Sequence, residues 1–320
     1  MWKNWIVQML FGLAVVLLVV YSLNILLSQK DNRFRPIRQI SLKEIADKTS
    51  EKALSHKTGA TTIRVAVAPV ISPESSLRMY QEFVDYLALQ LDRKGFLILR
   101  NSYAEINNLI RQRECDLALI CTYPFVQGER DFGLQVIAVP QINNKTTYQA
   151  LIVVPADSTA KTLLDLQGKH FGSSDHLSTS GWLYPAVWLL NHGKDPEHFF
   201  YEHILTGSHD KSVNALIKGY VDAVSVHSVV YEQMARTDKN IRENTRVIMI
   251  SEDYGMPPVV VHPKTDPQLK KRIQDIMLSM HTSEEGKAVL AKLGIDRYVL
   301  AEPTLHDSVR KAAQTWETKQ

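Results

Sequence analysis

The chain has 320 residues, of which 45% are hydrophobic and 22% charged, and its formal net charge at pH 7 is +3. This balance is typical of a globular protein, and the small charge, without a basic run interleaved with aromatic residues, argues against a nucleic-acid-binding protein. The two cysteines, Cys115 and Cys121, exclude a disulfide framework. They flank an apolar run expected to form a strand of roughly 20 Å. That length keeps them too far apart for a disulfide, so we expect two buried thiols.

Residues 5–27 form an almost continuously apolar segment, long enough to cross a bilayer as a helix. A cleavable signal peptide is the alternative, but a short apolar core and a small-x-small cleavage site are not clear here. We therefore expect a transmembrane anchor over residues 1–28 and a polar linker over residues 29–61. More basic residues follow the apolar segment than precede it, which by the positive-inside rule alone would place the rest of the chain in the cytoplasm.

From residue 63 onward, strand-like and helix-like segments alternate. Apolar runs typical of strands lie at residues 63–70, 96–99, 116–120, 135–139, 150–154, 221–226 and 247–250. Segments with a helical pattern lie at residues 75–91, 103–113, 211–218, 266–280, 283–293 and 304–316. This alternation predicts an α/β fold with a mainly parallel sheet.

Two short extended segments, residues 148–154 and 257–262, bracket the middle of this region. If both run between lobes, the chain leaves a first lobe, builds a second and returns through a two-strand hinge. We therefore expect lobe 1 at residues 62–150 and 257–320, and lobe 2 at residues 151–256. Ligands in open α/β sheets bind at the carboxyl ends of strands, so residues 122–124, 178–180 and 208–209 are expected to face the cleft.

Three hydroxyl-bearing residues, Ser178, Thr179 and Ser180, run into an apolar, helix-like segment that ends at residues 191–193. The first N–H groups of a helix lack partners and its dipole is positive there, so such a place suits a phosphate-like oxyanion. The alternative is that one of these residues is only a helix cap. His209 precedes another predicted helix; it is either a surface histidine or an imidazole donor to the same oxyanion.

Three motifs resemble, in order and spacing, the phosphonate/phosphite/phosphate-binding proteins of ABC importers, the PhnD-like family. They are Ser178-Thr179-Ser180-Gly181, Gly207-Ser208-His209 and the segment over residues 215–223. The resemblance runs from about residue 63 to residue 301, and the S-T-S-G and S-H pair together carry it. It implies a type II periplasmic-binding-protein fold whose two lobes close on a small oxyanion.

In that family, the S-T-S hydroxyls and the histidine hold the phosphoryl oxygens. The resemblance assigns these roles to Ser178, Thr179, Ser180 and His209. Two tyrosines often assist, and they match Tyr103 and Tyr148; a core or cleft-wall role is the alternative for both. The family also implies that the soluble domain is extracytoplasmic, opposite to the charge rule, and we follow the family here.

The chain departs from the family where phosphonate binders use acidic residues. Residues 225–229 carry no carboxylate, and Asp253 is at best an approximate match for an acidic residue before the second hinge strand. An anionic ligand such as phosphate, phosphite or a simple phosphonate is therefore expected rather than a zwitterionic aminoalkylphosphonate.

Three functions compete at this point. The first is a membrane-anchored solute-binding component that delivers its ligand to an ABC permease, and the second is a membrane-tethered sensor that uses the same cleft. The third is a hydrolase built on Ser180, His209 and Asp222, which is disfavoured because Ser180 does not lie in a G-x-S-x-G elbow. We expect a binding protein with no catalytic residue and no cofactor. We also expect no metal site, since the histidines lack metal-ligand spacing.

Overall fold

The computed structural model describes residues 62–319. The predicted anchor, residues 1–28, and the predicted linker, residues 29–61, lie outside the described residues. Within residues 62–319, no helix combines the length and the apolar character needed to span a membrane.

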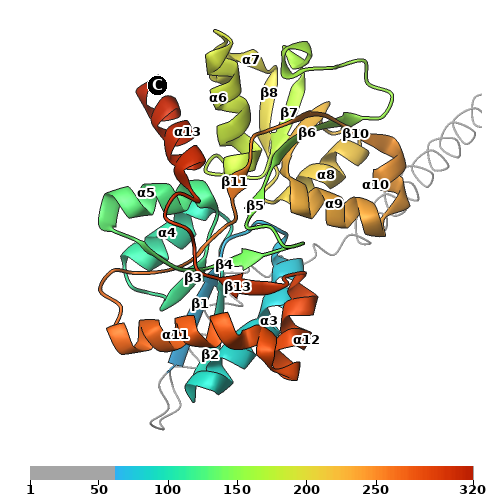
Figure 1. Cartoon of the computed structure of the whole chain (residues 1–320). Helices are drawn as coiled ribbons and strands as arrows, with labels where there is room; N and C mark the ends of the chain where they lie inside the picture. Colours follow the sequence, from blue (N-terminus) through green and yellow to red (C-terminus); the bar gives the residue numbers. More distant parts are fainter. Residues whose placement is uncertain (1–61, 320) are drawn as a thin grey trace, which may run out of the picture. The chain divides into compact units, whose positions relative to one another are not determined.

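A six-stranded sheet forms the centre of the first lobe (Figure 1). Its order is β13 (Arg297–Val299), β4 (Gln135–Gln141), β12 (Val259–Val261), β3 (Leu117–Leu119), β1 (Thr62–Val67) and β2 (Lys94–Leu99). Its helices are α3 (Pro73–Leu91), α4 (Tyr103–Arg111), α5 (Thr122–Phe132), α11 (Pro267–Ser279) and α12 (Glu284–Leu293), with a short 3₁₀ turn at Met280–Thr282. Alternate residues of β1 face opposite layers, as the period of a strand requires. Val65 packs in a cluster with α3, α11 and α12, whereas Ala66 packs in a cluster with α4 and α5.

A five-stranded sheet forms the second lobe. Its order is β10 (Thr245–Ile250), β6 (Ala150–Pro155), β9 (Ala223–His227), β7 (His170–Ser173) and β8 (Glu202–Leu205). Its helices are α6 (Tyr184–Asn191), α7 (Pro196–Phe199), α8 (His209–Ile217), α9 (Ser228–Thr237) and α10 (Lys239–Asn244), with 3₁₀ residues at Leu163–Leu166. Val153 and Val224 pack with α8, α9 and α10, while Ile152 and Phe171 belong to a second cluster that includes α6.

The sheets are mixed, so the prediction of a mainly parallel sheet is wrong. Strands β1, β2 and β3 pair in parallel, as do β7, β8 and β9. By contrast, β12 pairs antiparallel with β3 and β4, and β6 pairs antiparallel with β9 and β10. The strands that carry the chain into each lobe from the other, β6 and β12, run against their neighbours. Their continuous apolar runs match buried strands of either direction, so the sequence pattern could not reveal this.

A two-stranded antiparallel pair links the connections between the lobes. Tyr148 of β5 (Thr147–Tyr148) pairs with Tyr254 of β11 (Tyr254–Gly255). Both predicted hinge segments consist largely of sheet strands, since residues 148–154 contain most of β6 and residues 257–262 contain β12. The paired parts of the two connections lie just before these strands. A Cβ at Gly255 would lie 2.5 Å from the carbonyl oxygen of Leu305, so glycine allows the close approach there.

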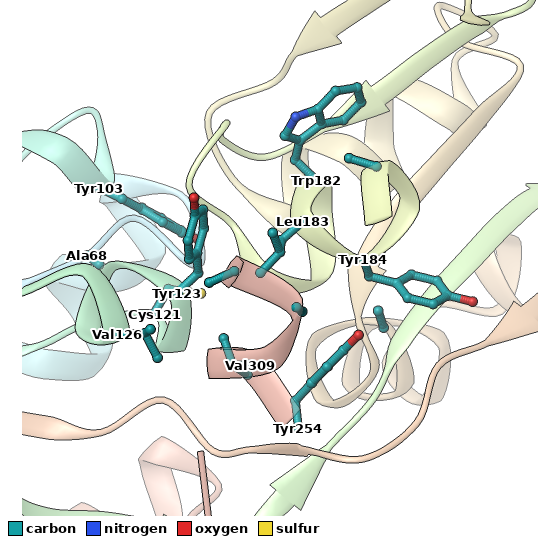
Figure 2. Close-up of a cluster of buried hydrophobic side chains, with 14 of the residues drawn as sticks. Ala68, Tyr103, Cys121, Tyr123, Val126, Trp182, Leu183, Tyr184, Tyr254 and Val309 are labelled. Atoms are coloured by element: carbon teal, nitrogen blue, oxygen red, sulfur yellow. The ribbon is translucent and has the colours of Figure 1, made fainter. Parts of the chain in front are cut away.

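The final helix, α13 (Asp307–Thr318), packs against both lobes. It contacts α5 of the first lobe and α6 of the second, and it lies between them in Figure 1. Figure 2 shows Val309 of α13 among Val126, Leu183 and Tyr254, and all four belong to one buried cluster. An apolar cluster therefore joins the two lobes in addition to the two chain connections.

The structure also settles two local predictions. Cys115 and Cys121 are buried free thiols, which confirms their predicted state. Residues 122–124, predicted as a cleft loop, instead form the first turn of α5. The helix was not predicted because it contains Pro124, and proline usually argues against a helix. Proline is tolerated in the first turn, however, because the N–H groups there have no partner within the helix.

Candidate functional site

The segment after Ser178 begins with a wide helical turn. Residues Thr179–Leu183 form a π-helical turn that continues into α6. The N–H of Gly181 donates to Oγ of Ser178 over 2.9 Å, and the N–H of Leu183 donates to the carbonyl of Ser178, also over 2.9 Å. Ser178 is thus a helix cap, as the alternative interpretation held, and its hydroxyl is also in reach of His209. Single π turns are frequent at functional sites.

Gly181 allows the hydroxyls around this turn to approach one another. A Cβ at this position would lie 2.8 Å from Oγ of Ser174 and 2.8 Å from Oγ of Ser178. Any larger residue would push these two hydroxyls apart. The glycine of the S-T-S-G motif is therefore explained by the packing of the serines themselves.

The side chain of His209 lies at the centre of these hydroxyls. Its Nε2 is 3.3 Å from Oγ of Ser178 and 3.4 Å from Oγ of both Ser174 and Ser180. We call these four side chains the serine–histidine ring. All four are at most 1% exposed. Nδ1 of His209 accepts the backbone N–H of His227 over 3.4 Å, so the neutral imidazole carries its proton on Nε2, directed at the serines.

Burial keeps His209 uncharged at neutral pH. Removal from water lowers the pKa of His209 to about 4, and the nearby Asp210 offsets only part of this. The ring therefore consists of neutral hydrogen-bond donors that are shielded from water.

Two tyrosine hydroxyls are buried beside the ring without a partner. Among residues 62–319, the hydroxyls of Tyr103 and Tyr148 have no hydrogen-bond partner, and neither does Nδ1 of His227. Burial raises the pKa of both tyrosines well above its ordinary value, so both hydroxyls keep their protons at neutral pH. Buried polar atoms are nearly always paired in native proteins, so unpaired ones require an explanation.

Hydrogen bonds join the two lobes around the ring. The N–H of Tyr123 donates to Oγ1 of Thr179 over 2.8 Å, and the N–H of Tyr103 donates to Asp175 over 3.1 Å. The N–H of His209 donates to the carbonyl of Val70 over 3.0 Å. Thr179 thus accepts a bond from the first lobe, and its Oγ1 also lies 3.5 Å from Sγ of Cys121 in the same lobe. The lobes are closed on each other at this site.

The structure brings together all six residues that were predicted to bind a ligand. The serine–histidine ring includes Ser178, Ser180 and His209, Thr179 lies in the same turn, and Tyr103 and Tyr148 contribute their hydroxyls from α4 and β5.

Sequence reasoning missed Ser174, Asp175 and His227. Ser174 directly follows β7, and His227 is the last residue of β9. Both therefore lie at carboxyl ends of strands, where ligands bind in such sheets, and this position was a usable signal.

The geometry does not support the hydrolase alternative. The carboxylate of Asp222 accepts the N–H of His170 over 2.8 Å, and the second nitrogen of His209 faces a backbone N–H. A general base needs an unprotonated Nε2 facing its serine, whereas this one carries the proton. Asp253 is exposed and accepts a hydrogen bond from Thr147, away from the ring. Within the described residues, no three His, Cys, Asp or Glu side chains are grouped as metal ligands.

A family model and a related protein of known description both match this chain, and both describe phosphonate-binding periplasmic proteins. A family model described as ABC transporter, phosphonate, periplasmic substrate-binding protein matches residues 65–305. The phosphonates-binding periplasmic protein of Escherichia coli (strain K12) is 23% identical over 233 residues, which cover 70% of this chain and 69% of that protein.

Two solved structures share the fold. A binding protein component of an ABC phosphonate transporter from Pseudomonas aeruginosa superposes with a TM-score of 0.75 at 20% identity, covering 81% of this chain and 87% of that one. PhnD1 from Prochlorococcus marinus (MIT 9301), in complex with methylphosphonate, gives a TM-score of 0.72 at 20% identity, covering 80% and 98%. These similarities show the two-lobed periplasmic-binding-protein fold.

The matched family consists of substrate-binding proteins of ABC transporters and not of enzymes, as predicted. Because its model spans well over half of the sequence, the chain belongs to the phosphonate periplasmic substrate-binding proteins of ABC transporters, the PhnD-like family.

Proposed function

We propose that this protein is the extracytoplasmic solute-binding component of an ABC importer and that it closes on a small phosphorus oxyanion. Phosphate, phosphite and simple phosphonates are the candidate ligands. The proposed contacts are the hydroxyls of Ser178, Thr179, Ser180, Tyr103 and Tyr148 and the imidazole of His209.

The observation that carries this proposal is the direction of the protons in the serine–histidine ring. Nε2–H of His209 points at three serine hydroxyls, each 3.3 to 3.4 Å away. Bonds of this length are weak, so little is lost when these donors turn to a bound anion. A tetrahedral oxyanion offers several acceptor oxygens, which suits a group of donors that converge from different elements.

The two orphaned tyrosine hydroxyls support the same ligand class. Tyr103 is 1% exposed and Tyr148 is 3% exposed, and each hydroxyl lacks a partner among the described residues. An unpaired buried hydroxyl costs about 1–3 kcal/mol. A ligand oxygen that accepts both hydroxyls would remove this cost. Because Tyr103 belongs to the first lobe and His209 to the second, such a ligand would also hold the lobes together.

Calorimetry on the full chain tests the proposal with phosphate, phosphite, methylphosphonate and sulfate as titrants. We expect one phosphorus anion to bind, and His209→Asn to weaken it about 10- to 100-fold, since the single charge-assisted bond from Nε2–H is lost. His203→Asn is the matched control, because His203 lies 2.7 Å from Oγ of Ser173 in the same lobe but outside the ring. The absence of binding by all the phosphorus anions would refute the proposed function.

Deletion of the gene distinguishes transport from sensing, because it should abolish uptake of the anion in the first case and a transcriptional response in the second. We propose transport, because the matched family is that of transporter binding proteins. Deletion of the gene should then abolish uptake of the anion, and His209→Asn should fail to restore it. A lost transcriptional response with normal uptake would instead support the membrane-tethered sensor.

We also propose that residues 5–27 anchor the protein as a single membrane span with the binding domain outside the cytoplasm. The support is the apolar sequence of this segment together with the periplasmic family. Extraction of membranes at alkaline pH should leave the full chain in the membrane pellet. Recovery of a shortened, soluble chain would favour a cleaved signal peptide.

A further inference from the structure

His227 is a buried polar group beside the ring that the family resemblance does not assign. It is 5% exposed, and its imidazole stacks flat on the ring of Tyr148, with 3.8 Å between centroids and 3° between planes. Its Nδ1 has no partner among residues 62–319. The centroid of its imidazole lies 6.0 Å from that of His209, and its backbone N–H fixes the proton of His209.

The charged groups on the surrounding elements are already engaged. Asp175, after β7, accepts the N–H groups of Tyr103 and Leu177 over 3.1 and 2.8 Å. Asp210 of α8 accepts the N–H of Ser72 over 2.9 Å and the hydroxyl of Ser208 over 2.6 Å. Tyr148 of β5 and His209 of α8 face His227 as uncharged groups at neutral pH. Burial and the neighbouring His209 lower the pKa of His227 well below its ordinary value, which keeps it uncharged too.

We propose that His227 directly contacts the bound phosphorus oxyanion and that it restricts the site to anions whose substituent is uncharged. This inference rests on the proposed function and adds the residue that produces the selectivity for an uncharged substituent. A cationic ammonium substituent needs a nearby acceptor with negative charge, since an unpaired buried charge is costly. A neutral imidazole supplies no such charge. Its free Nδ1 pairs instead with the phosphorus group: according to its tautomer, it donates to an unprotonated oxygen or accepts from a P–OH group.

The stacking on Tyr148 gives this contact a fixed position. A ring held flat against an aromatic neighbour cannot tilt freely, so Nδ1 keeps one direction relative to the tyrosine hydroxyl. His227 ends a buried strand, and Tyr148 belongs to the connection between the lobes. The two unpaired groups therefore form one rigid wall.

The test uses calorimetry on the full chain with methylphosphonate and 2-aminoethylphosphonate as paired titrants. These ligands share the phosphonate group and differ in the charge of the substituent. The wild type should prefer methylphosphonate. His227→Asn should weaken methylphosphonate about 10- to 100-fold, as expected for loss of a hydrogen bond to a charged group. His227→Glu should invert the preference, because its carboxylate repels the anion and pairs with the ammonium group.

His192→Glu is the matched control, since His192 is exposed at the end of α6; it should leave both affinities unchanged. A second measurement avoids dependence on variants that fold poorly. In histidine-labelled wild-type protein, the Nδ1 resonance of His227, assigned by its absence in His227→Asn, should shift when methylphosphonate saturates the site.

The outcomes separate the inference from the proposed function. If His209→Asn loses methylphosphonate while folded His227→Asn binds it normally, the role of His227 is wrong and the oxyanion site stands. An unshifted His227 resonance at saturation, or wild-type binding of both ligands with equal affinity, also contradicts the inference. If the wild type binds no phosphorus anion, both proposals fail together.

Discussion

The two lobes contact each other in two regions, around the serine–histidine ring and along α13, and the interactions in these regions differ in kind. Around the serine–histidine ring, the lobes meet through directional hydrogen bonds such as that from Tyr123 to Thr179, and unpaired polar atoms remain buried there. Along α13, they meet through an apolar cluster that includes Val309 and Trp316. Apolar packing stabilises in proportion to the area removed from water, whereas each net hydrogen bond contributes little and each unmade one costs. Stability should therefore depend on α13, and ligand affinity on the ring.

Among the variants proposed here, Trp316→Ala should lower the free energy of unfolding the most. Trp316 is 7% exposed and meets Trp182 edge to face at 6.2 Å. Loss of such a side chain from a core costs about 3–5 kcal/mol, to be measured by urea unfolding. Gln314→Ala, on the exposed side of the same helix, should stay within about 0.5 kcal/mol. A stable Trp316→Ala protein would show that α13 does not support the closed lobes.

Acid should weaken the serine–histidine ring by protonating His209. The pKa of His209 is about 4 in the folded protein and 6.5 in its ordinary state. The unfolded chain thus binds more protons, so the stability due to neutral His209 is present above pH 6.5 and is lost as pH falls toward 4. Between pH 7 and pH 4.5, the loss of unfolding free energy should be about 2 kcal/mol smaller in His209→Gln than in the wild type, since one pKa unit is about 1.4 kcal/mol and the shift is only partly expressed at these pH values.

Unfolding at the two pH values measures this difference. His198→Gln serves as control, because His198 is exposed and its pKa is raised by Asp195, which is the opposite direction. If the wild type and His209→Gln lose equal unfolding free energy between pH 7 and pH 4.5, a group other than His209 causes the acid sensitivity. Methylphosphonate should reduce the loss in the wild type, because a bound anion stabilises the protonated imidazole.

Ser180→Ala should weaken binding of the anion while leaving the free energy of unfolding almost unchanged. The serine hydroxyl makes only a 3.4 Å contact to His209, so its removal should change the free energy of unfolding by less than about 1 kcal/mol. The anion should bind about 10- to 100-fold more weakly, as expected for loss of a charge-assisted bond. Ser173→Ala, outside the ring, should keep full affinity in the same calorimetric titration. A large loss of stability in Ser180→Ala would mean that the ring is a structural element.

Arg310→Ala should have the smallest effect. Arg310 of α13 donates to both oxygens of Glu129 on α5 over 2.8 and 2.9 Å, but both side chains are about one third exposed. Pairs of this kind contribute about 0–1 kcal/mol. The wild-type advantage in urea unfolding should disappear in concentrated salt. If Arg310→Ala loses more unfolding free energy than Trp316→Ala, ion pairs rather than apolar packing join α13 to the first lobe.

The alternation of helices and strands and the position of the serine–histidine ring could both be predicted from the sequence. Helix stripes such as residues 75–91 and the hydroxyl run at residues 178–180 are local patterns, and local patterns determine where a helix begins. The six predicted contacts then followed from the family resemblance, and the structure groups them.

The rest depended on tertiary context that no local pattern encodes. The direction of β12 depends on the path of the chain back from the other lobe, and the first turn of α5 contains a proline. The strand-end positions of Ser174 and His227 could be read from the sequence, but their neighbours could not. Ser174 approaches Ser178 beside Gly181, and His227 stacks on Tyr148 with an unpaired Nδ1. His209 illustrates the same limit, because its tautomer is set by a backbone N–H from another strand.

The residue that follows Gly181 is a tryptophan, and this places an optical reporter at the site. The indole of Trp182 stacks on His203 at 3.8 Å and meets Trp316 edge on. A shift of the π-helical turn would change both contacts, and with them the emission of this indole. The chain contains five tryptophans, and Trp182→Phe identifies the contribution of this one. If the proposed anion displaces this turn when it binds, binding to the unmodified protein is measurable by tryptophan fluorescence without an attached dye.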